Sequence, residues 1–121
     1  MKNLLLVLLF MVPALMFSQG RMLISNKVTW LSQKNGGEWT PEKTEYKTNV
    51  WELVDNKFVW RTNNNSFYIV MNQEIINNDE VFYCLGRTGQ EATFVIKENV
   101  LMIILKYREN YWISAVFDMN Y

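Results

Sequence analysis

Turn signals divide this chain at short and regular intervals, and this pattern is the feature that most restricts its fold. From Asp55 onward, clusters of Asn, Asp or Gly recur every 8 to 14 residues. Asn and Asp tolerate positive φ and bond their own backbone, so they suit two-residue hairpin loops such as Asp55-Asn56. The pattern therefore indicates hairpins between short strands. The signals are Asn35-Gly36-Gly37, Asp55-Asn56, Asn63-Asn64-Asn65, Asn77-Asn78, Gly86-Arg87-Thr88-Gly89, Glu98-Asn99 and Glu109-Asn110.

The segments between these turns are rich in β-branched and aromatic residues, which favour strands. Because only a few residues join each pair after Tyr46, neighbouring strands are expected to be antiparallel. The sequence predicts an all-β fold, a single small antiparallel meander of about eight strands that forms a barrel or a sandwich. One helical turn is expected at Thr40-Pro41-Glu42-Lys43, with Thr40 as its N-cap. The expected strands are Leu23–Leu31, Tyr46–Val54, Lys57–Thr62, Phe67–Ile76, Glu80–Leu85, Glu91–Lys97, Val100–Tyr107 and Tyr111–Phe117.

Two of these strands differ in their polarity. Phe67–Ile76 alternates between apolar and polar residues, as expected for a strand that is half in water. Val100–Leu105 has no polar residue on either face, so we expect it to be covered on both sides. The cover would be the loop Gln33–Glu45 or a second chain.

The N-terminal segment, residues 1–20, has the pattern of a secretory signal peptide. Lys2 precedes an apolar run that closes on Ser18-Gln19-Gly20, and the run is shorter than the roughly 20 residues that cross a bilayer. We expect a helical signal peptide that is cleaved near Ser18–Gly20. Residues 21–121 would then form one β domain, secreted or periplasmic and free of the membrane.

Charge and composition exclude several kinds of function. The 12 basic and 12 acidic residues give no net charge and form no basic stripe, which argues against a nucleic-acid binder. The chain has no histidine, so histidine-based nucleophiles and metal sites are not expected. The carboxylate pairs Glu42/Glu45 and Asp79/Glu80 are expected to be solvated. We therefore expect no catalytic residue, no cofactor and no metal.

Cys84 is the single cysteine of the chain, so no intrachain disulfide can form. It lies within Val-Phe-Tyr-Cys-Leu, where a buried small hydrophobic side chain is expected. The alternative is a free thiol that is catalytic or pairs between chains.

Five tryptophans in so short a chain suggest an aromatic binding face. An exposed ring can lie on the apolar face of a sugar, with amides and charged groups beside it. The alternative is that the rings fill the core, because large aromatic side chains bury much area. The candidate binding surface is Trp39, Trp51, Trp60, Arg61 and Trp112.

The order of several motifs resembles small uncharacterised secreted proteins of Bacteroidota. The end of the apolar run, Leu15-Met16-Phe17-Ser18-Gln19, is similar to export signals of that group. Some members carry a second cysteine near Ala92, which this chain lacks, so a disulfide or metal role does not transfer. The resemblance implies secretion but no activity. The motifs in matching order are Trp30, Trp39, Phe67-Tyr68-Ile69, Phe82-Tyr83-Cys84 and Gly89.

Three functions remain open at this point. The leading expectation is an exported non-enzymatic β-domain that binds a partner protein, a glycan or a ligand through an aromatic face or a sheet edge, or that forms a homodimer over Val100–Leu105. A second is an inhibitor of an extracellular or periplasmic enzyme such as lysozyme. The third is a small apolar-ligand carrier, because Gly37-Glu38-Trp39 is similar to the Gly-x-Trp signature of lipocalins.

Overall fold

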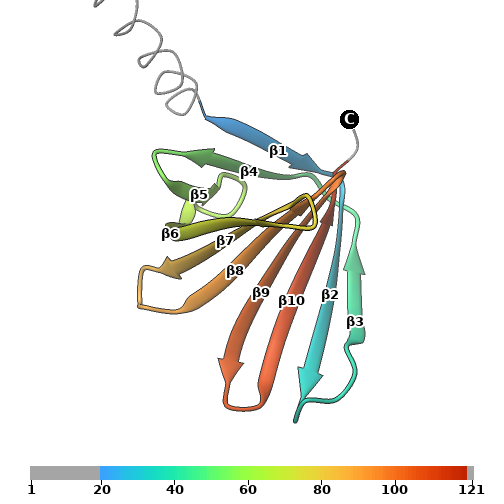
Figure 1. Cartoon of the computed structure of the whole chain (residues 1–121). Coiled ribbons are helices and arrows are strands. Elements are labelled where there is room, and N and C mark those ends of the chain that lie inside the picture. Colours follow the sequence, from blue (N-terminus) through green and yellow to red (C-terminus); the bar gives the residue numbers. More distant parts are fainter. Residues whose placement is uncertain (1–19, 120–121) are drawn as a thin grey trace, which may run out of the picture.

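The computed structural model describes residues 20–119, and all of its regular elements are β-strands (Figure 1). The predicted signal peptide falls almost entirely outside this part of the chain. The strands are β1 (Arg21–Ser25), β2 (Lys27–Lys34), β3 (Thr40–Glu45), β4 (Asn49–Val54), β5 (Lys57–Trp60), β6 (Ser66–Ile76), β7 (Asp79–Gly86), β8 (Glu91–Lys97), β9 (Val100–Arg108) and β10 (Tyr111–Asp118).

These ten strands form one antiparallel sheet in the order β1-β4-β5-β6-β7-β8-β9-β10-β2-β3. Strands β4 to β10 are neighbours in chain order, as a meander requires. The sheet curls into a half-barrel: Figure 1 shows the strands from β6 through β10 to β2 and β3 converging at one end and spreading at the other, with β1 and β4 lying across them. The predicted all-β antiparallel architecture is confirmed.

The additional strands arise at two places where the prediction was wrong. Leu23–Leu31 was expected as one strand, but it divides at Asn26 into β1, which pairs with β4, and β2, which pairs with β10. Ser25 holds this corner, since its Oγ donates to the Lys27 carbonyl at 2.8 Å and accepts from the Lys27 N–H at 3.2 Å. A single residue thus carries the chain from one edge of the sheet to the region of the other.

The segment expected to contain a helical turn is instead the edge strand β3. It pairs with β2 with a register shift between Trp30 and Leu31. Pro41 fits there because an edge strand does not need every backbone donor. The segment Gln33–Glu45 therefore extends the sheet, and it does not cover Val100–Leu105 as one alternative proposed.

The turns themselves agree with the sequence signals. Both central residues of the β4–β5 hairpin have positive φ, 51° at Asp55 and 62° at Asn56. The β6–β7 hairpin repeats this with 52° at Asn77 and 69° at Asn78. Positive φ at both central positions is the geometry of the tight turn that matches strand twist.

Aromatic rings fill the concave side of the sheet. Phe58 of β5 stacks on Phe94 of β8 with ring centres 4.3 Å apart. Trp51 of β4 stacks on Trp60 at 4.8 Å and meets Phe94 and Phe117 edge-on at 5.3 and 5.8 Å. Trp51 and Trp60 belong to neighbouring strands, whereas the contacts with Phe94 and Phe117 join strands far apart in the sheet order and so hold the curl together. Burial of each such side chain contributes roughly 1.5–3 kcal/mol.

Strand β9 is covered on one side within residues 20–119. Leu101 and Ile103 point into the core with 0% and 4% exposure. Met102 and Ile104 alternate with them on the convex face and are only half-buried, with no second layer of strands over them (Figure 1). The expectation that this apolar strand is fully covered on both sides is wrong for the described part.

An ion pair joins the edge strand β1 to β7 in the middle of the sheet. Arg21 Nη1 of β1 donates to both carboxylate oxygens of Glu80 in β7, at 2.8 and 3.1 Å. The pair is partly exposed and is worth at most about 1 kcal/mol.

No helix among residues 20–119 is long and apolar enough to cross a membrane.

Candidate binding site

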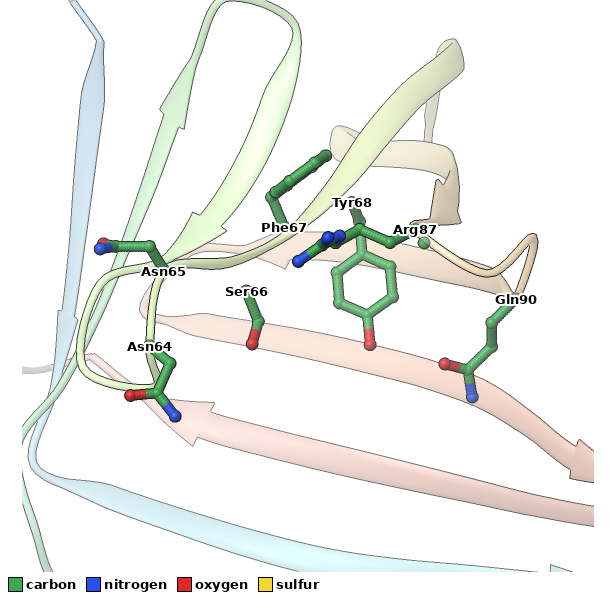
Figure 2. A pocket seen from close by; sticks show the side chains of 8 residues that line it. Asn64, Asn65, Ser66, Phe67, Tyr68, Arg87 and Gln90 are labelled. Atoms are coloured by element: carbon green, nitrogen blue, oxygen red, sulfur yellow. The ribbon is translucent and has the colours of Figure 1, made fainter.

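An open depression lies between the β5–β6 loop and the β7–β8 turn (Figure 2). The two turns are neighbours because Tyr68 of β6 pairs with Gly86 of β7. The volume of the depression is about 290 Å³, close to the lower end of the roughly 300–1,000 Å³ range of small-molecule sites. Its lining residues are Asn64, Asn65, Ser66, Phe67, Tyr68, Gly86, Arg87 and Gln90.

The β5–β6 loop has a defined backbone conformation. Asn64 and Asn65 both have a φ of 54°, a left-handed value that Asn adopts more readily than most residues. The carbonyl of Asn63 accepts the N–H of Ser66 at 3.1 Å and its hydroxyl at 2.9 Å. These bonds close the loop and present the Asn64 amide at the rim of the depression.

Arg61 fixes the base of this loop. Its Nε and Nη2 donate to the Glu52 carboxylate at 2.9 and 2.6 Å, and its Nη1 donates to Asn65 Oδ1 at 3.3 Å. Its backbone N–H donates to the Val50 carbonyl at 2.8 Å. Arg61 was predicted as a surface binding residue, but it lies beside the depression and positions the loop.

Tyr68 forms the aromatic part of the lining. Its ring packs against Phe94 of the core, with centres 5.3 Å apart. A Cβ at Gly86 would lie 3.2 Å from Tyr68 Cε1, so the missing side chain leaves the space that the ring occupies. Burial raises the pKa of Tyr68 above its ordinary value of 10.0, so its hydroxyl stays protonated near neutral pH.

Three polar groups of the depression have no hydrogen-bond partner in the described part of the chain. Among residues 20–119, the amides of Asn64 and Gln90 and the hydroxyl of Tyr68 take part in no side-chain hydrogen bond or ion pair. Figure 2 shows the side chains of Ser66, Tyr68 and Gln90 pointing to the same side of the sheet, with Phe67 on the opposite side. Of the uncommitted groups, the Tyr68 hydroxyl and the Gln90 amide thus lie on the same side of the sheet.

The chemistry of this lining is hydrogen bonding by neutral groups. An amide offers both donors and acceptors, and a phenol hydroxyl offers one of each. Arg87 is the one charged lining residue, and its guanidinium lies 6.0 Å from the centre of the Phe67 ring. The other lining side chains hydrogen-bond through neutral amides and hydroxyls, so the depression suits a ligand with several hydroxyl or amide groups.

The predicted tryptophan surface does not exist as one patch. Trp51 is 1% exposed and belongs to the core, so its assignment to a binding surface was wrong. Trp60 is half-buried beside it and donates its Nε1–H to Asn49 Oδ1 at 3.1 Å. Trp39 and Trp112 remain accessible, but they lie near β2 and β10 and do not line the depression.

Sequence reasoning missed Asn64, Tyr68 and Gln90 as a group. Asn64 belongs to a recognised turn signal and Tyr68 to an expected strand, whereas Gln90 lies between the turn Gly86–Gly89 and the strand Glu91–Lys97. The missing information was the register between β6 and β7, which brings the two turns together. Counting back along both strands from the hairpin Asn77-Asn78 would give this register only as far as Asn72. A register shift between Val70 and Asn72 then displaces the pairing at Tyr68.

The other candidate chemical groups have structural roles. Cys84 is 4% exposed, which confirms the predicted burial, and desolvation raises its pKa to about 12. The pKa of Glu45 is lowered chiefly by the hydrogen bond that Trp30 Nε1 donates at 3.0 Å. Asp79 pairs with Lys97 at 3.6 Å. Within residues 20–119 no group of three or more acidic, Cys or His side chains is placed to hold a metal ion.

Comparison with known proteins gives no relative for this chain. No protein-family model matches it, and neither a curated protein nor a solved structure is significantly similar to it.

Proposed function

We propose that this chain is an exported, non-enzymatic β-domain that binds a neutral glycan in the depression between its β5–β6 loop and its β7–β8 turn. The observation that carries the proposal is that three uncommitted polar side chains, Asn64, Tyr68 and Gln90, line the same depression. The half-buried ring of Tyr68 also forms part of this lining. Sugar hydroxyls both donate and accept, so they complement amide and phenol groups. The signal-like sequence of residues 1–20 supports export from the cytoplasm. An exported domain would encounter extracellular glycans.

The packing of the interior favours this function over an apolar-ligand carrier. A lipocalin-like carrier needs open space inside the curled sheet. Here that space holds stacked rings: Phe58, Phe94 and Phe117 are each 0% exposed. The depression is instead at the surface and partly polar, which suits a hydrophilic ligand.

The proposal predicts that two conservative changes weaken glycan binding. Residues 21–121 are screened on an array of neutral oligosaccharides, and dissociation constants are measured for the best ligand. Gln90→Ala and Tyr68→Phe each remove hydrogen-bonding groups, and one neutral hydrogen bond is worth about 0.5–1.5 kcal/mol. We therefore expect each variant to bind about two- to tenfold more weakly.

Matched controls lie elsewhere on the sheet. Gln33→Ala removes an amide from β2 that bonds only the Gly37 carbonyl, at 2.7 Å. Tyr107→Phe removes a hydroxyl from an exposed tyrosine of β9. Both variants should bind like the parent chain. If no neutral oligosaccharide binds, or if the controls lose as much affinity as the depression variants, the proposal is wrong.

A further inference from the structure

Strand β6 is longer than its neighbour β5, so the C-terminal part of β6 has a paired strand on one side alone among the described residues. Strand β5 pairs with β6 only as far as Ile69. At the next residue the Val70 N–H donates to the Asn56 carbonyl at 2.9 Å, and Asn56 Nδ2 donates to the Val70 carbonyl at 3.0 Å. Beyond this point lies Met71–Ile76, in which Asn72–Ile76 pairs with β7 on one side and Met71 is the extra residue at the register shift. Its other side faces no described strand, and we call this stretch the β6 edge.

The β6 edge is exposed and apolar at several positions. All six of its residues are exposed, and Met71, Ile75 and Ile76 have exposures of 62%, 69% and 46%. Proteins commonly protect free strand edges with lysine, proline or a covering element. Met71–Ile76 contains no lysine and no proline, and its one register shift is at its start. An unprotected edge of this kind is suited to receive another strand.

We propose that the β6 edge binds an extended segment of a partner protein, which adds one strand to the sheet. This surface is separate from the glycan depression and does not depend on it. Main-chain hydrogen bonds would give the affinity, and alternate side chains would give the specificity. The partner segment is expected to be apolar opposite Ile75 and Ile76.

Glu74 indicates the charge of the partner. Its carboxylate accepts the hydroxyl hydrogen of Tyr83, but none of the ion pairs found among residues 20–119 includes it. The β6 edge contains no positive charge to balance it. A residue of opposite charge directly across from Glu74 would stabilise the strand pairing. The partner strand should therefore place Lys or Arg opposite Glu74.

The geometry favours a partner segment over a second copy of this chain. A two-fold pairing centred on Gln73 would carry the second copy to the position opposite Val70, which Asn56 already occupies. A pairing centred on Glu74 would place two Glu74 carboxylates opposite each other, and like charges there are destabilising. A linear segment can end opposite Met71 and avoids both problems.

The test uses a designed probe, the capped hexapeptide Ile-Val-Lys-Thr-Thr-Val, which places Lys opposite Glu74 when it pairs antiparallel with the β6 edge. Binding and amide hydrogen exchange are followed by NMR on residues 21–121. We expect the added protection to be confined to residues 71–76. The peptide with Glu in place of Lys should bind about three- to tenfold more weakly, because an attraction becomes a repulsion.

Two variants separate this model from others. Glu74→Lys should reverse the preference between the two peptides, whereas Tyr107→Lys, at an exposed residue of β9, should leave it unchanged. The proposal is overturned if neither peptide protects the β6 edge, or if the charge preference survives Glu74→Lys. It is also overturned if sedimentation shows a concentration-dependent dimer that Ile75→Lys abolishes, because the occupant would then be a second copy.

Discussion

Single residues in this chain show how one side-chain type takes different roles in different surroundings. Trp51 is closed inside the core, while Trp39 at the start of β3 is 38% exposed. Tyr68 lies between these extremes, with its ring on the core and its hydroxyl in the depression. The sequence identifies all three as strand or turn aromatics. It does not reveal their exposure, because exposure depends on which face of the curled sheet each residue occupies.

Cys84 gives a prediction about pH. Burial raises its pKa from 9.0 to about 12, so on raising the pH the unfolded chain releases this proton before the folded chain does. The contribution of the Cys84 thiol to stability is therefore fully present below pH 9 and is lost as the pH rises from 9 towards 12. At pH 10.5 we expect urea unfolding to give an unfolding free energy about 1–2 kcal/mol lower than below pH 9, and we expect this decrease to be smaller in Cys84→Ala. Rapid alkylation of the native thiol at pH 8 would contradict this burial.

At the scale of the elements, hairpins were predictable and strand breaks were not. Asp55-Asn56 and Asn77-Asn78 lie in the turns that their residue types favour. The division at Asn26 has no comparable signal, because a single asparagine, here between Ser25 and Lys27, also occurs inside strands. Pro41 was interpreted as a helix start because it can serve there, but edge strands tolerate it equally.

The alternating burial along β9 predicts that the adjacent residues Ile103 and Ile104 contribute differently to the unfolding free energy. Ile103→Ala removes a core side chain that is 4% exposed and should cost about 2–5 kcal/mol of unfolding free energy. Ile104→Ala changes the half-buried convex face and should cost no more than about 1 kcal/mol. Urea unfolding of both variants measures the difference. Equal losses would mean that a second layer or a second chain covers the convex face.

At the scale of the whole molecule, the closure of the sheet could not be predicted from the sequence. Local patterns indicate which residues form strands, whereas the curl depends on contacts between strands far apart in the sheet order, such as Phe58 with Phe94. The register between β6 and β7, with its shift between Val70 and Asn72, brings the Asn63-Asn64-Asn65 loop beside the Gly86–Gly89 turn. The candidate binding site is therefore a product of the whole fold.

The central claim is that this depression is where the molecule binds its ligand, and chemical-shift mapping tests it most directly. Isotope-labelled chain, residues 21–121, is titrated with the neutral oligosaccharide that binds best on the array. If the depression is the ligand site, the largest shifts fall in residues 64–68 and 86–90 and include the side-chain amide of Gln90. Shifts centred on Trp39 and Trp112, or no shifts with any neutral oligosaccharide, would contradict it.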